Sequence, residues 1–380
     1  MVYGLISEFN PFHNGHKWLI EQVKGEENTV ITVMSGSFVQ RGDISIINKY
    51  DKARASLQNG VDLVIELPAV YSLANAEIFA KSAVSILDKT GVTDRLFFGS
   101  ECGDIDVINN ALDIINNQNV QAKIKENMNK GLYYPKAIYN SIKELYNEET
   151  AKIFDGSNNI LGLEYLKALK DTKMSGVTFK RTGSDHDSNE VTENIANGSF
   201  IRKNYSDKEL YIPKYPIQDT AVIENIEKLI IYKISQMTEN ELREIPDVSE
   251  GIEKRIIECA GRYNSFAELC NGIKTKRYTM ARIRRILCCA VLGITRETQS
   301  TEVPYIKVLG FTKKGEKLLS KIKESSPLPL ITNVKAGYDA LDKKGKKIMD
   351  IDLLATRLWS LSSNNSTVLK NDFTQPIIKA

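Results

Sequence analysis

The chain has 380 residues, of which 42% are hydrophobic and 26% charged, and its formal net charge is only +3. This balance is typical of a globular protein of two or three domains. It argues against a globally basic nucleic-acid binder, a membrane-spanning chain and a disulfide-rich module. The five cysteines form no CxxC pair, and the short apolar run at the start lacks a basic segment before it. We therefore expect reduced thiols, no signal peptide and a cytoplasmic location.

The first stretch of the chain concentrates its chemistry. An apolar run over residues 2–6 predicts a buried strand, and a turn follows at residues 10–11 (Asn-Pro). His13 and His16 then flank an Asn-Gly pair at the start of a helical segment, and the whole chain has only three histidines. Free N–H groups and the dipole at a helix N-terminus attract anions, and glycine permits close approach of a ligand. The pattern favours an anion site over a simple surface loop.

The rest of the first half alternates strands and helices. Apolar, β-branched runs predict buried strands, and segments of helical periodicity separate them. The expected strands cover residues 29–34, 62–67, 95–98 and 176–181. The expected helices cover residues 49–58, 74–87, 104–116, 120–130, 135–145 and 159–169. Such alternation predicts βαβ units and an α/β fold, with a Rossmann-like parallel sheet covered on both faces.

Polar, glycine-containing loops follow four of these strands. They span residues 10–16, 35–43, 99–101 and 181–187, and the last contains His186. Because ligands bind at the carboxyl ends of parallel strands, we expect these loops to converge on one pocket. A further segment at residues 196–203 offers backbone donors and the planar guanidinium of Arg202, which suits phosphate oxygens.

The character of the sequence changes after about residue 206. A proline-containing linker at residues 211–216 leads into helical patterns over residues 223–237, 250–262, 265–273 and 279–292. One stretch here is basic and lacks acidic residues, with Tyr278 among the cations; a weaker run covers residues 313–323. Such clusters can bind phosphate backbones or simply form a solvated helix face. The candidate nucleic-acid-binding residues are Lys274, Lys276, Arg277, Arg282, Arg284 and Arg285.

The motifs also restrict the chemistry. The sequence has no GxxxxGK[ST] segment, and its first turn lacks GxGxxG. These absences argue against a P-loop ATPase and a dehydrogenase. A histidine pair aimed at phosphates can instead stabilise the charge that builds on an α-phosphate when an oxygen nucleophile attacks and pyrophosphate leaves. The residues favour nucleotidyl transfer.

At this point a family resemblance emerges. Residues 13–16 resemble the HxGH signature of the nucleotidylyltransferase superfamily, and residues 197–202 (Asn-Gly-Ser-Phe-Ile-Arg) are similar to its second signature, with departures at Asn197 and Phe200. Five segments taken together resemble the bacterial tRNA(Met) cytidine acetate ligase family. They are residues 8–16, 34–43, 59–68, 98–101 and 157–165.

The resemblance implies a reaction and a set of residues. ATP would activate acetate as acetyl-adenylate, and the acetyl group would pass to N4 of the wobble cytidine of elongator tRNA(Met). His13 and His16 would be catalytic phosphate donors. The implied ATP-binding residues are Ile6, Ser7, Glu8, Phe9, Asn10, Pro11, Phe12, His13, Asn14, Gly15, His16, Lys17, Trp18, Leu19, Gly99, Asn158, Arg181 and Arg202.

The same resemblance bounds the partners. Residues 1–205 would form the nucleotide-binding domain and residues 206–380 a mainly helical tRNA-binding domain. Mg²⁺ is expected to arrive with ATP, with Asp43 and Glu101 as weak candidate ligands and no tightly bound metal. We expect no membrane association and no obligate protein partner.

Two other functions remain open from the sequence. A small-molecule adenylyl- or cytidylyltransferase would explain both signatures but leaves the basic helical part without a task. A non-enzymatic RNA-binding factor with a vestigial nucleotide fold would explain the helical part, and it predicts that His13 and His16 are dispensable.

Overall fold

The computed structural model describes residues 1–181, 194–249, 251–365 and 371–380. At its centre lies an eight-stranded sheet, in which five strands of the first half run parallel in the order β5-β2-β1-β6-β7. These strands are β1 (Val2–Ser7), β2 (Thr29–Ser35), β5 (Leu63–Leu67), β6 (Arg95–Ser100) and β7 (Ser175–Lys180). The expected Rossmann-like parallel sheet is confirmed.

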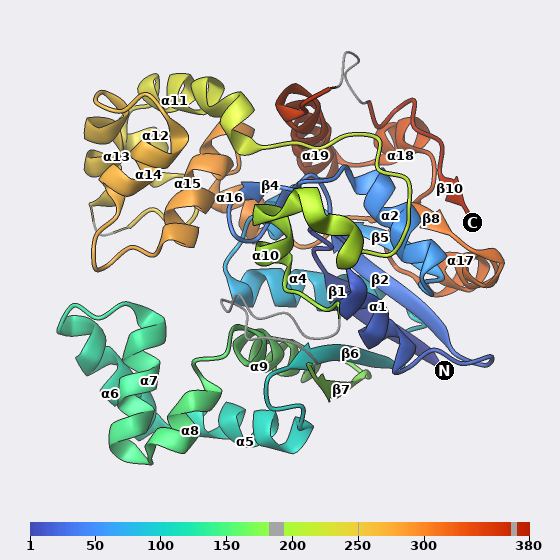
Figure 1. Cartoon of the computed structure of the whole chain (residues 1–380), viewed down its shortest axis with the longest axis horizontal. Helices are drawn as coiled ribbons and strands as arrows, with labels where there is room; N and C mark the ends of the chain where they lie inside the picture. Colours follow the sequence, from blue (N-terminus) through green and yellow to red (C-terminus); the bar gives the residue numbers. More distant parts are fainter. Residues whose placement is uncertain (182–193, 250, 366–370) are drawn as a thin grey trace.

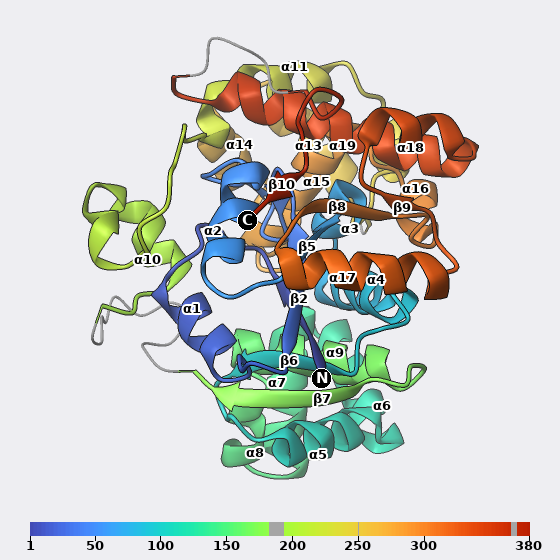
Figure 2. The same cartoon turned by 90° about the vertical axis from the view of Figure 1, so that its right-hand side faces the viewer.

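Helices cover both faces of the sheet (Figure 2). Successive strand residues point to opposite faces, so Leu5 and Ile6 enter two different buried clusters. Helices α1 and α2 close the cluster around Leu5, and α4 and α9 close the one around Ile6. Their bounds are α1 (Asn14–Glu21), α2 (Lys49–Gln58), α4 (Ala76–Lys89) and α9 (Ser157–Leu169). Coverage of both faces explains why the strands read as continuous apolar runs.

Two helical groups extend from this core on different sides (Figure 1). The teal-to-green group lies between β6 and α9 in the chain. It contains α5 (Ile105–Asn116), α6 (Gln118–Asn129), α7 (Tyr134–Leu145) and α8 (Glu148–Ile153). The yellow-to-orange group follows the linker. It contains α11 (Glu227–Ser235), α12 (Glu239–Arg243), α13 (Ile252–Ala260), α14 (Phe266–Ile273) and α15 (Met280–Leu292).

The end of the chain differs from the expectation of a mainly helical second domain. Helices dominate residues 206–380, but β8 (Ile306–Phe311) joins the central sheet beside β5 in antiparallel orientation. All six β8 residues are buried, because the strand is covered on both faces. It is flanked by β9 (Leu330–Ile331) and β10 (Ile378–Lys379). The last part of the chain therefore shares the sheet of the first.

Further helices complete this last part. They are α16 (Arg296–Ser300), α17 (Lys313–Ser325), α18 (Val334–Ala340) and α19 (Lys343–Ser362). The weaker basic run lies on α17, which buries Leu318 and Ile322 and exposes its lysines. No helix within the described residues is long and apolar enough to cross a membrane.

The strand order places a crevice at one edge of the sheet. The chain runs from β1 outward to β2 and β5, and then returns to the other side of β1 to form β6 and β7. At such a reversal, the loops after the two central strands separate and leave room for a ligand at their carboxyl ends. The histidine pair follows β1 directly, and Gly99 lies in β6. The fold thus brings both to this crevice.

Candidate functional site

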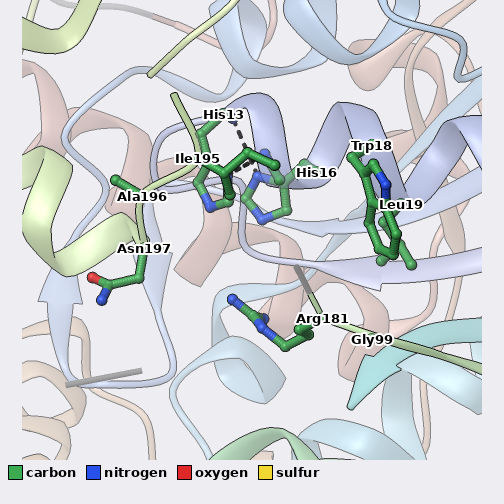
Figure 3. A pocket seen from close by; sticks show the side chains of 10 residues that line it. His13, His16, Trp18, Leu19, Gly99, Arg181, Ile195, Ala196 and Asn197 are labelled. Carbon is green, nitrogen blue, oxygen red and sulfur yellow. Dashed lines mark hydrogen bonds between the residues drawn. The ribbon is translucent and has the colours of Figure 1, made fainter. Parts of the chain in front are cut away.

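His13 and His16 are held by the first turn of α1. His13 is the N-cap: its Nδ1 accepts the backbone N–H of Gly15 at 3.1 Å. His16 reaches back, and its Nδ1 accepts the N–H of His13 at 3.2 Å. The two rings lie against each other in Figure 3. They stack with centroids 3.7 Å apart. A Cβ at residue 15 would lie 3.0 Å from the His13 ring, so glycine there makes room for the stack.

These contacts fix the protonation of both rings. Burial, followed by the positive charges of Arg181 and Arg202, lowers the pKa of His13 to about 3. Burial and the neighbouring His13 and Arg181 lower the pKa of His16 well below its usual value. Both imidazoles are therefore neutral near pH 7. Because each Nδ1 accepts a backbone N–H, each ring carries its proton on Nε2 and offers one donor.

Two arginines add positive charge to the same crevice. Arg181, at the end of β7, donates from Nη1 to Asn158 Oδ1 at 2.9 Å and lies across from the histidines in Figure 3. Arg202, in α10 (Gly198–Lys203), donates to the carbonyl of Asn10 at 2.6 Å. Burial lowers the pKa of both guanidinium groups, which nevertheless stay charged. Within the described chain, neither forms an ion pair with a carboxylate. The crevice therefore presents two guanidinium groups that are not paired directly with a carboxylate, and it suits an anion.

The loops around the crevice are tied down by buried polar contacts. Asn10 Oδ1 accepts the N–H of Ile46 at 2.8 Å. Lys52, in α2, is fully buried and donates to the carbonyls of Glu8, Ser35 and Gly36 at 2.8–3.0 Å. One ammonium group thus joins the carboxyl ends of β1 and β2. Such rigidity preorganises donors for a charged ligand.

Neither candidate magnesium ligand is free. Glu101 accepts the backbone N–H groups of Asn158 and Asn159, at 3.0 and 2.6 Å, and so caps the N-terminus of α9. Asp43 forms an ion pair with Arg284 at 2.6 Å. Among the described residues, no group of three or more His, Cys, Asp or Glu side chains could hold a metal ion. Glu101 instead positions Asn158, which in turn holds Arg181.

An open cavity of about 1110 Å³ occupies the crevice, and a smaller hollow of about 460 Å³ continues it past Trp18 (Figure 3). Most residues predicted to bind ATP line one or the other. They are Ile6, Ser7, Glu8, Phe9, Asn10, His13, Gly15, His16, Trp18, Leu19, Gly99, Asn158, Arg181 and Arg202.

The other predicted ATP-binding residues lie outside both hollows. Pro11 and Phe12 are buried beneath the loop, and Lys17 is exposed beside Glu21. The Asn14 side chain donates to the carbonyls of Asn194 and Leu210. The fourth expected loop, with His186, lies outside the described residues.

Several lining residues escaped the sequence analysis. The cavity is also bounded by Gln40, Arg41, Phe79, Phe98, Leu161 and Tyr165. Phe79, Leu161 and Tyr165 come from helices, where apolar spacing predicts only a packed face. Gln40 and Arg41 lie in the loop at residues 35–43, which was expected to reach the pocket. That loop, which also carries part of the family resemblance, was the signal for Gln40 and Arg41.

The basic segment contains exposed residues and residues that are paired within the protein. Lys274, Lys276 and Arg277 are exposed. In α15, Arg284 pairs with Asp43, and Arg285 pairs with Asp247 at 2.8 Å.

The remaining members are also engaged within the protein. Arg282 donates to the Asp247 carbonyl and to Ser249. Tyr278 is buried, with 7% of its surface exposed, so its ring is not available to stack on an unpaired base. The exposed part of the segment is the part that remains a candidate for nucleic-acid contact.

Fold and crevice together define a nucleotidyl transferase, and the comparisons agree. The sequence matches the model of the HIGH Nucleotidyl Transferase family over residues 1–373. The chain is 37% identical to a tRNA(Met) cytidine acetate ligase of Thermoanaerobacter sp. (strain X514), covering 100% of this chain and 99% of that protein. It is 34% identical to a protein of the same name from Acetivibrio thermocellus, with 99% of each covered. The chain belongs to the tRNA(Met) cytidine acetate ligase family.

Solved structures agree with this assignment. Thermotoga maritima TmcAL in its apo form superposes with a TM-score of 0.89 at 29% identity, covering 100% of this chain and 99% of that one. The same T. maritima protein bound with alpha-thio ATP gives a TM-score of 0.88 at 28% identity, with the same coverage. The expected family and nucleotidylyltransferase fold are confirmed.

Proposed function

We propose that this chain is an ATP-dependent ligase that acetylates N4 of the wobble cytidine, position 34, of elongator tRNA(Met). Acetate is first activated as acetyl-adenylate, and AMP and pyrophosphate are released. One observation carries the proposal: two neutral imidazole donors and two guanidinium groups share a crevice in which they form no ion pair with a described carboxylate. The names of the relatives and the ATP analogue bound to the T. maritima neighbour support it.

In the first step, a carboxylate oxygen of acetate attacks the α-phosphorus of ATP. A new P–O bond forms, the bond between the α-phosphorus and the bridging oxygen breaks, and pyrophosphate leaves. The Nε2–H groups of His13 and His16 donate to phosphate oxygens, while Arg181 and Arg202 offset the charge that builds on them. Donors fixed by their own backbone contacts need little reorganisation as the charge develops.

In the second step, the cytidine N4 amine attacks the acyl carbon, AMP leaves, and the amine loses a proton. The anticodon arm must then reach the crevice from solvent. The exposed Lys274, Lys276 and Arg277 are our candidates for contacts with its phosphates. We expect the reaction in the cytoplasm, where both ATP and tRNA are found.

Mg²⁺ remains an expectation tied to ATP. Both candidate carboxylates, Asp43 and Glu101, are already engaged within the protein. The described residues therefore provide no dedicated cage for the ion, and an ion bound mainly by the nucleotide phosphates fits them better. The contribution of this chain is the set of donors around those phosphates.

The test is mass spectrometry of tRNA after incubation with the purified protein, ATP and acetate. Nuclease digests should contain N4-acetylcytidine only when all three are present, and labelled acetate should provide the acetyl group. A digest in which the mark is absent, while ATP is bound normally, would contradict the proposal. Elongator and initiator tRNA(Met) form the matched substrate pair.

A further inference from the structure

Part of the cavity is lined by residues that we do not expect to contact an ATP molecule bound at His13 and His16. This end of the cavity is bounded by the loop after β2, by α4, by β6 and by α9. Five lining residues come from these elements: Gln40, Phe79, Phe98, Leu161 and Tyr165. Four of them belong to one apolar cluster, and Gln40 is joined to Glu8, whose charge acts on Tyr165. None of the five belongs to the set expected to bind ATP.

The wall of this end is apolar. Phe79 and Phe98 are almost fully buried, with 2% and 4% of their surface exposed. Phe98 meets the ring of Tyr165 edge to face, with centroids 5.4 Å apart. Leu161 packs against the same cluster. A wall of this kind favours a small apolar group.

Two polar groups of this region can donate to a ligand, and one of them lacks a partner. The side-chain nitrogen of Gln40 is buried and forms no hydrogen bond with any described residue. Its backbone is fixed, because Gln40 N donates to Glu8 Oε1 at 2.7 Å. The Tyr165 side chain is 2% exposed and lines the same cavity, into which its hydroxyl can donate. A buried donor without a partner, such as the Gln40 nitrogen, destabilises the protein until an acceptor reaches it.

The charges nearby permit a carboxylate at this end. Burial, followed by the charge of Glu8, raises the pKa of Tyr165, so its hydroxyl remains a donor. Glu8 lies close enough to Arg202 to interact with it, whereas burial lowers the pKa of the neighbouring Lys52 to about 7. Arg202 therefore reduces the repulsion between Glu8 and a second anion there.

We infer that this end of the cavity is the acyl subsite, where Gln40 and Tyr165 donate to one carboxylate oxygen of acetate and the wall of Phe79, Phe98 and Leu161 encloses its methyl group. The inference rests on the proposed function. Acetate is ionised near pH 7, so its other oxygen attacks the α-phosphorus and pyrophosphate leaves without any proton transfer from acetate. The subsite holds the nucleophile next to the phosphate donors His13 and His16.

Steady-state pyrophosphate release tests the subsite, with formate, acetate, propionate and butyrate as probes. We expect Gln40→Leu and Tyr165→Phe each to raise the KM for acetate about tenfold, because each removes a donor, and to leave the KM for ATP unchanged. Phe79→Ala and Leu161→Ala should raise the propionate-to-acetate ratio of kcat/KM about tenfold. The matched control is Tyr205→Phe, since the Tyr205 hydroxyl is also buried without a described partner but lies outside the cavity.

Each outcome of this experiment supports or overturns the acyl subsite. Unchanged acetate KM and chain-length preference in all four variants would overturn the subsite while leaving the proposed function standing. A rise in the KM for tRNA instead would assign this end to the cytosine base. If the wild-type protein binds ATP but consumes no carboxylate of the series, the proposed function fails and the subsite fails with it.

Discussion

Two groups of charged side chains, one buried and one lining the crevice, are built differently. In the first, Lys49 and Lys307 each contact both Glu66 and Asp372 at 2.6–2.8 Å. In the second, the crevice, Arg181 and Arg202 contact only neutral oxygens. Only the first group pairs its cations directly with carboxylates.

The pKa values reflect this difference. Burial alone would lower the pKa of Lys49, but Asp372 and Glu66 raise it above its usual value. Burial alone would raise the pKa of Asp372, but Lys307 and Lys49 hold it below its usual range. In the crevice nothing opposes burial, so the pKa of His13 falls to about 3. We call the first group closed, because its lysines and carboxylates pair with one another and join α2, β5, β8 and the end of the chain. We call the second group open, because its arginines and histidines can still donate to a ligand.

Breaking the closed group should have the largest effect. Asp372→Ala removes the carboxylate that contacts both lysines and leaves their charges buried without that partner. We expect the free energy of unfolding to fall by about 3–5 kcal/mol in urea titration. The control is Glu297→Ala, which breaks an exposed ion pair with Lys347 and should change it by less than about 1 kcal/mol. Equal losses of unfolding free energy in the two variants would contradict the idea that the buried ion pairs stabilise the protein more than the exposed pair.

Changing the open group should affect rate more than stability. In His13→Asn and His16→Asn, the amide oxygen can replace Nδ1 as acceptor, but the Nε2–H donor is lost. We expect pyrophosphate release to slow by about 10²–10³-fold. Glu21→Gln, on the exposed side of α1, should leave the rate unchanged. A histidine variant with full activity and normal ATP affinity would show that the pair does not face the phosphates.

Stability against pH provides a second test of the open group. His13 has a pKa of about 3 when folded and 6.5 ordinarily, so the unfolded chain binds the proton first as pH falls. The free energy of unfolding should therefore decrease from pH 7 to pH 5, with His13 contributing about 2 kcal/mol of that loss. In urea titrations at pH 7 and pH 5, the His13→Asn variant should lose less stability between the two pH values, by the His13 contribution. An identical pH dependence in the variant would mean that the imidazole is protonated in the folded protein.

We expect the smallest effect from changes in the basic segment, on the affinity for tRNA. Some of its residues are exposed, and others are paired within the protein. The double variant Lys276→Ala, Arg277→Ala should reduce the slope of log K for tRNA against log salt by about 1 per lost phosphate contact. Arg284→Ala should leave that slope unchanged, because Arg284 pairs with Asp43. Filter binding between about 50 and 200 mM salt measures both. The reverse result would place the paired arginine, not the exposed cations, at the tRNA.

Local patterns predicted the crevice better than the closed group. The strand, turn and helix around His13 and His16 are encoded in adjacent residues, and strand alternation then places Gly99 beside them. Lys49 and Asp372 lie 323 positions apart, and no periodicity links them. Strand β8 escaped prediction because its short apolar run follows long helical segments, where a buried strand and a buried helix segment look alike.

Sequence patterns also failed to identify some of the residues inside the cavity. Gln40 and Tyr165 became candidates only because both line it and the buried side-chain nitrogen of Gln40 has no partner. Conversely, Glu101 and Arg284 resemble ligand-binding residues in sequence, but each is engaged by another part of the protein. Sequence indicates which side chains can bind an anion, and the fold decides which of them still lack a partner.

The most direct test of the central claim is the rate of pyrophosphate release from ATP by the purified protein, with and without acetate. If the open group of donors serves acyl activation, release should depend on acetate, and added tRNA(Met) should convert the bound acetyl-adenylate to AMP. Release at the same rate without acetate, or none with acetate while ATP binds, would contradict the account.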